Sequence, residues 1–170
     1  MPSNPYTPGQ VPRILAARAV EMRRIEGLIA RVATYGELGG PLLVFHAPRG
    51  IGKTSLLRAG QRRAAEAGFV TAWVACSRQQ PVLPEIAHSV ARALERAEAV
   101  PGGAAGNRWR GQLERFTVEV GLPGARVQAE VGRREATARP QAAIGVLESL
   151  LHDAATAVRE HGGAGLLLML

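Results

Sequence analysis

One short segment of the chain combines glycine, lysine and hydroxyl side chains in an order that can bind phosphate. Gly50 and Gly52 can adopt positive φ and leave room for an anion beside the main chain. Consecutive N–H groups of such a turn point inward at the positive end of a helix dipole. Lys53 adds a positive charge for the phosphate oxygens, and the Thr54 hydroxyl is a hard oxygen ligand suited to Mg²⁺. The spacing therefore predicts a phosphate-binding loop.

The whole segment is a Walker A pattern in which alanine replaces the first glycine. The predicted nucleotide-binding residues of the loop are Ala47, Pro48, Arg49, Gly50, Ile51, Gly52, Lys53, Thr54 and Ser55. Thr54 is also the predicted metal ligand, and Ser55 is expected to donate to the α-phosphate. The alternative is a glycine-rich turn with an exposed lysine, which the flanking strand and helix patterns disfavour.

Alternating elements must hold this loop in place. Apolar spacing predicts helices at about 19–32, 53–67, 83–97 and 144–158, and it predicts buried strands at 42–45, 69–76 and 166–170. The loop would join the first strand to the second helix. Strands that alternate with helices indicate parallel βαβ units and an α/β fold.

Two irregular segments interrupt this alternation. Residues 100–107 contain proline and several glycines and are predicted to form a loop. Residues 113–132 contain two runs with alternating apolar side chains around a glycine-proline turn. This pattern predicts an inserted β-hairpin with one solvated face and an exposed edge for a partner.

The strand, loop and helix at 42–67 resemble AAA+ ATPases, in particular the bacterial domains of the origin-recognition-complex-like and STAND types. The resemblance implies a three-layer α/β/α P-loop NTPase core with a parallel sheet. Residues 1–18 would form an N-terminal arm and an adenine-side box, and residues 19–170 would form the N-terminal part of the ATPase domain. The implied ligands are ATP and Mg²⁺.

The same resemblance assigns residues near the N-terminus. Val11, Pro12, Leu15 and Ala17 would line an adenine pocket, where alanine replaces the family's glycine at position 17. Arg18 and Glu21 would lock this box to the core. The alternative for these two side chains is a solvated ion pair in the first turn of a helix.

In this family the third strand ends in a pair of acids that orders Mg²⁺ and polarises the attacking water. The run 166–170 has the character of that strand, and the acids would follow Leu170, so no catalytic residue is predicted within the chain. The family's fourth strand, which separates the first from the third, would also follow. We expect nucleotide binding here, and hydrolysis and a nucleotide-dependent switch only in the intact domain.

Composition limits the partners. The net charge is +7, but 20 of the 21 basic residues are scattered arginines, so the case for nucleic acid is weak. Trp109 lies between Arg108 and Arg110 and is predicted to pack at the surface, with base stacking as the alternative. The expected partners are a nucleotide and either a second copy or other domains of the parent protein. The rival function is a non-catalytic module that binds protein or nucleic acid and has a vestigial loop.

The remaining counts indicate the compartment. One cysteine excludes an internal disulfide, and the four histidines lack metal-binding spacing. No secretory signal is visible in the first residues, and no apolar run is long enough to span a bilayer. We therefore expect a cytoplasmic protein without a membrane partner.

Overall fold

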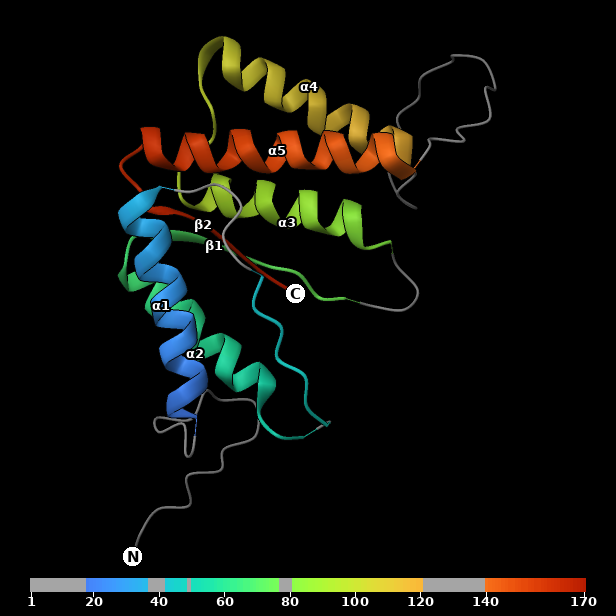
Figure 1. Cartoon of the computed structure of the whole chain (residues 1–170). Helices are drawn as coiled ribbons and strands as arrows, with labels where there is room; N and C mark the ends of the chain where they lie inside the picture. Colours follow the sequence, from blue (N-terminus) through green and yellow to red (C-terminus); the bar gives the residue numbers. More distant parts are fainter. Residues whose placement is uncertain (1–17, 37–41, 49, 77–80, 121–139) are drawn as a thin grey trace, which may run out of the picture.

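The computed structural model describes residues 18–36, 42–48, 50–76, 81–120 and 140–170, and these form a mixed helix and strand structure (Figure 1). Its elements are α1 (Ala19–Tyr35), α2 (Lys53–Glu66), β1 (Phe69–Trp73), α3 (Val82–Arg96), α4 (Gly103–Val120), α5 (Pro140–Glu160) and β2 (Gly165–Met169). The predicted α/β class is confirmed at this level. None of the described helices has the length and apolar character needed to cross a membrane.

The two strands form a small parallel sheet, in which Phe69 lies opposite Gly165 and Trp73 opposite Met169. Both strands were predicted, β1 from its β-branched and aromatic residues and β2 from its continuous apolar run. Parallel neighbours need a long connection, and here α3, α4 and α5 lie in it. The turns that lead into the strands are also joined, because Ala164 N–H donates to the Gly68 carbonyl at 2.9 Å.

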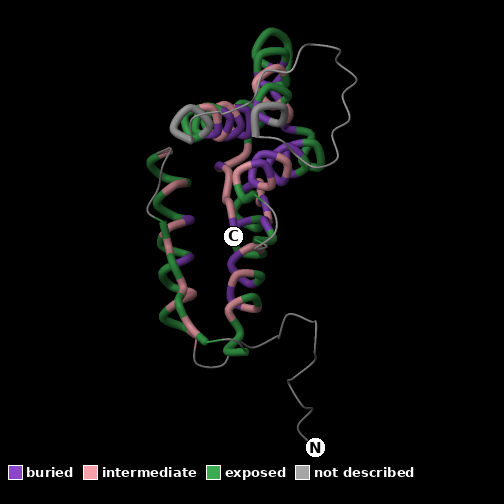
Figure 2. Tube along the Cα trace, turned by 90° about the vertical axis from the view of Figure 1, so that its right-hand side faces the viewer, coloured by how far each residue is buried: buried purple, intermediate pink, exposed green. Residues whose placement is uncertain are grey.

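Helices pack on both faces of the sheet. The side chains of Ala72 in β1 and of Val74, just after it, lie in a large apolar cluster with residues of α3, α4 and α5. Phe69 points to the opposite face and packs with Ile25 of α1 and Leu56 of α2 in a smaller cluster. Figure 2 shows the difference in size between the two clusters, since buried positions gather in the upper half of the molecule, where α3, α4 and α5 lie.

Glycines lie at the ends of helices and at a close contact between two helices. Gly36 follows α1 in the left-handed conformation, with φ of 63°. After α5, Gly162 has φ of 80° and Gly163 N–H donates to the Val158 carbonyl at 2.9 Å. Within α2, a Cβ at Gly60 would lie 3.1 Å from Ile25, so glycine lets α1 approach α2 closely.

The predicted strand at 42–45 is wrong. Residues 42–48 belong to neither strand of the described sheet, and their exposure alternates along the segment. Leu42 and Val44 are 83% and 75% exposed, whereas Leu43 and Phe45 pack against the α1–α2 cluster. An apolar run forms a strand only where a neighbour pairs with its backbone, and the described sheet gives this segment no such neighbour.

The predicted loop at 100–107 and hairpin at 113–132 are also wrong where they can be compared. Helix α4 begins at Gly103 and continues to Val120, so it includes the first arm of the predicted hairpin. Trp109 and Phe116 are buried, with Leu113 packed between them in sequence, and this four-then-three spacing forms one helical face. Three alternating residues were too short a run to establish a strand. Residues 121–132 lie outside the described part of the chain.

Candidate phosphate-binding loop

The loop lies at the N-terminus of α2, where backbone N–H groups lack helical partners. Gly52 is the N-cap, with φ of 75° and ψ of 24°, and no side chain caps this end of the helix. Gly50 has φ of 92°, so both predicted positive-φ glycines are confirmed. The Gly52 carbonyl accepts the first helical hydrogen bond, which Leu56 N–H donates at 3.0 Å.

Lys53 folds back over the loop. Its ammonium group donates to the Ala47 carbonyl at 2.6 Å and to the Pro48 carbonyl at 2.8 Å. These two bonds bring the only lysine of the chain against the residues that precede the turn. A flexible ammonium held by neutral carbonyls keeps its full charge available, and an anionic ligand is a stronger acceptor than either carbonyl.

Arg18 ties the beginning of α1 to the same loop. Its guanidinium donates to the Ile51 carbonyl at 2.6 Å and to Glu21 Oε1 at 2.8 Å. The arrangement therefore includes the helical i,i+3 ion pair, in which both side chains are 26% exposed, and adds a contact with the loop. Hydrogen bonding from Arg18 lowers the pKa of Glu21 below its ordinary value of 4.5.

No pattern in the sequence indicates the contact between Arg18 and Ile51. These residues are 33 positions apart, and the acceptor is a backbone carbonyl whose direction depends on the turn. Only the resemblance had suggested that Arg18 acts near the nucleotide. The structure supplies the physical connection, because Arg18 bonds to a carbonyl between the two loop glycines.

The space beside the loop suits a phosphate group. A Cβ built on Gly50 or Gly52 would meet nothing within 4 Å, so the main chain borders open space. Thr54 is exposed and Ser55 is half-buried. Within the described residues, no backbone carbonyl accepts from the N–H groups of Gly52, Thr54 or Ser55. These donors and the adjacent ammonium fit an anion with several oxygens.

Several predicted site residues cannot be compared with the structure. Arg49 and the adenine-side residues Val11, Pro12, Leu15 and Ala17 lie outside the described residues. Across the ranges that are described, no group of three or more histidine, cysteine or acidic side chains could hold a metal ion. The Thr54 hydroxyl stays the predicted metal ligand, to which the nucleotide phosphates themselves would have to add oxygens.

Trp109 is not a surface residue, contrary to the prediction from its arginine neighbours. It is 4% exposed, and its Nε1–H donates to the Leu150 carbonyl of α5 at 3.3 Å. Its place in the apolar cluster follows from the helical spacing of α4. Stacking of this ring on a nucleic-acid base would require that cluster to open.

No family model, no curated protein and no solved structure matches this chain. The loop therefore has to be interpreted from its own geometry: two positive-φ glycines, an uncapped helix N-terminus, a lysine bridging two carbonyls, and an arginine bonded to the turn.

Proposed function

We propose that residues 47–55 bind the phosphates of Mg-ATP. The observation that carries this proposal is the position of the Lys53 ammonium, 2.6 Å from the Ala47 carbonyl, at the uncapped end of α2. There it faces the same turn as the free N–H groups that follow Gly52. Positive charge and unpaired donors together on a glycine turn are what a polyphosphate requires.

Each residue of the loop has a separate part in this binding. Lys53 would exchange its two carbonyl partners for the β- and γ-phosphate oxygens, and the N–H groups of Gly52 and Thr54 would donate to the phosphates. Arg18 fixes the turn through the Ile51 carbonyl, which limits the motion of the donors. Bound Mg²⁺, held by Thr54 and phosphate oxygens, would neutralise charge on the phosphates.

We further propose that the described elements are part of a three-layer P-loop domain. Three features support this fold: the parallel neighbours β1 and β2, the helices on both of their faces, and the separate extended segment at 42–48. In the AAA+ arrangement a fourth strand separates the strands that correspond to 42–48 and β2. Hydrolysis would also require acidic residues that order Mg²⁺ and polarise the attacking water, and nucleotide state would then act as a switch in a cytoplasmic protein.

The experiment is a calorimetric titration of Mg-ATP into the 170-residue chain and its variants. Lys53→Ala should weaken binding by more than about tenfold, because a charge-assisted contact to phosphate is lost. Arg110→Ala, at an exposed position of α4, removes the same charge elsewhere and should leave the affinity unchanged. Equal affinity of Lys53→Ala and the unmodified chain, with unchanged circular dichroism, would refute the proposal.

The rival function, a non-catalytic protein- or nucleic-acid-binding module, stays a prediction with less to support it. The described part of the predicted hairpin, which was to bind a partner, is helical, and Trp109, the candidate for base stacking, is buried. DNA binding that falls steeply with added salt and is insensitive to ATP would favour it over nucleotide binding.

A further inference from the structure

The outer edge of β1 forms one side of a second site, a basic groove distinct from the phosphate loop. The groove has a volume of about 660 Å³ and is bordered by α2, β1 and α3. Its charged lining consists of Arg58 from α2 together with Arg92 and Arg96 from α3, and no acidic residue lines it. The proposed nucleotide site uses none of these side chains.

The backbone of β1 is available along this edge. Val74 N–H donates to the Met169 carbonyl at 2.7 Å, so its backbone groups point toward β2. Since these groups alternate along a strand, those of Thr71 and Trp73 point away from β2. In the part of the chain that the structure describes, β1 has β2 as its neighbour on one side and no strand on the other.

Side chains from α2 organise one wall of the groove. Arg58 lies over the ring of Trp73, 3.9 Å from its centroid, and donates to Gln61 Oε1 at 2.9 Å. Gln61 in turn donates to Thr71 Oγ1 at 3.1 Å. Stacking fixes the direction of the Arg58 side chain without neutralising its charge, because the ring is uncharged.

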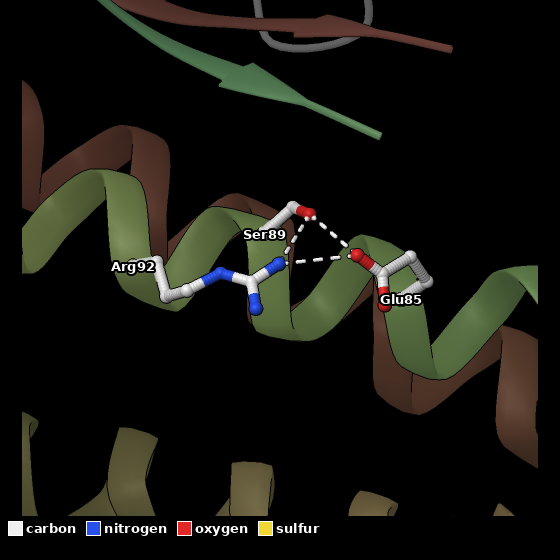
Figure 3. A network of polar contacts seen from close by, with 3 residues as sticks. All are labelled: Glu85, Ser89 and Arg92. Atoms are coloured by element: carbon white, nitrogen blue, oxygen red, sulfur yellow. Dashed lines mark hydrogen bonds and ion pairs between the residues drawn. The ribbon is translucent and has the colours of Figure 1, made fainter. Parts of the chain in front are cut away.

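Side chains from α3 organise the other wall (Figure 3). The Arg92 guanidinium donates to Glu85 Oε1 at 3.1 Å and to Ser89 Oγ at 3.2 Å, and the Ser89 hydroxyl donates to Glu85 at 3.2 Å. Ser89 is 2% exposed and anchors this network at the base of the groove. Among the described residues Arg96 has no acidic partner, so its charge is free to meet a ligand.

We propose that this groove binds an extended acidic segment of a partner protein, which adds as a strand to the free edge of β1. The exposed backbone groups of Thr71 and Trp73 would pair with the incoming strand. Successive side chains of a strand point to opposite faces. Two neighbouring acids would therefore reach Arg58 on one side and the Arg92–Arg96 pair on the other.

A ligand of this kind must have both an extended backbone and negative charge. A small anion would use the arginines alone. Arginines beside an edge strand can also serve only to prevent self-association of that edge. The experiment must separate these three roles.

The test is fluorescence anisotropy with the 170-residue chain and a labelled peptide of sequence Thr-Val-Glu-Glu-Val-Thr, without nucleotide. We expect saturable binding that is lost when alternate peptide nitrogens are methylated, which removes the donors of a strand while leaving the charge. A peptide with glutamine in place of both glutamates should bind at least about tenfold more weakly. Its backbone can still pair with β1, but its side chains carry no negative charge for the arginines.

Variants of the chain complete the test. Arg96→Glu should weaken binding of the acidic peptide by about tenfold, whereas Arg110→Glu, with the same change in net charge on α4, should not. Lys53→Ala should bind the peptide normally, so failure of the nucleotide proposal would not affect this one. The proposal is overturned if the acidic peptide does not bind, or if the methylated peptide binds as well as the unmethylated one. A change in self-association as the only effect of Arg96→Glu would likewise overturn it.

Discussion

The two faces of the β1–β2 sheet are built differently. On the face toward α3, α4 and α5, apolar side chains such as Ala72 and Val74 are fully buried among Leu94 and Phe116. On the face toward α1 and α2, Phe69 is buried, but Thr71 and Trp73 contact the polar groups of Gln61 and Arg58. The first face thus supplies most of the apolar burial, and the second holds the phosphate loop and one wall of the basic groove.

This difference separates the face with most of the apolar burial from the face with the candidate phosphate-binding loop. Burial on the α3–α5 face removes apolar surface from water, which is the main favourable contribution to folding. The α1–α2 face keeps exposed glycines, an uncapped helix end and charged side chains, which stabilise little. Substitutions on the two faces should therefore have different consequences.

Phe116→Ala should cause the largest loss of stability. This side chain is 0% exposed between α4 and the cluster on α3 and α5, so its removal leaves a cavity. We expect the free energy of unfolding to fall by about 3–5 kcal/mol, measured by urea denaturation. Leu43→Ala on the other face removes a half-buried side chain and should cost clearly less. Equal losses would show that the two faces contribute alike.

Gly52→Ala should cost less stability than Phe116→Ala but should disturb the backbone conformation of the loop. Because φ is 75° and a Cβ would meet nothing within 4 Å, the cost comes from the left-handed backbone alone, about 1–2 kcal/mol. Gly27→Ala is the matched control, since this helical glycine also has open space around it, and it should stabilise the chain by about 0.5–1 kcal/mol. If both variants were stabilised, Gly52 would not need its positive φ.

Glu21→Gln should have the smallest effect, and that effect should depend on pH. Because Arg18 lowers the pKa of Glu21, the ion pair stabilises the folded chain at pH values above 4.5, the ordinary pKa of this carboxyl group. This contribution is lost as the pH falls through the lowered pKa of the folded state. The difference in melting temperature between the two chains should therefore shrink as the pH is lowered from about 7 toward 3. A difference that grows on acidification would contradict the assigned cause.

The sequence predicts the local features of this molecule well. Apolar spacing predicts α1, α2, α3 and α5, and the glycine spacing of the loop predicts the positive φ at Gly50 and Gly52. These features depend on residues close together in the chain. Helix-end glycines and left-handed turns need no distant partner to be recognised.

Features that depend on distant neighbours were predicted poorly. The run at 42–48 has strand composition but no paired strand in the described sheet. In α4, the alternation of Phe116, Val118 and Val120 favoured a strand, but Trp109 and Phe116 lie on one helical face that packs in the cluster with α3 and α5. The basic groove could not be predicted either, because Arg58, Trp73 and Arg96 come together only when α2 and α3 flank β1.

Phosphate binding at residues 47–55 can be tested one amide at a time, by NMR of the ¹⁵N-labelled chain as Mg-ATP is added. We predict that the N–H signals of Gly50, Gly52 and Thr54 shift most, since these groups border the space proposed for the phosphates. The signals of Thr71 and Ser89 in the basic groove should not move. Unchanged loop signals, or shifts confined to that groove, would contradict phosphate binding at residues 47–55.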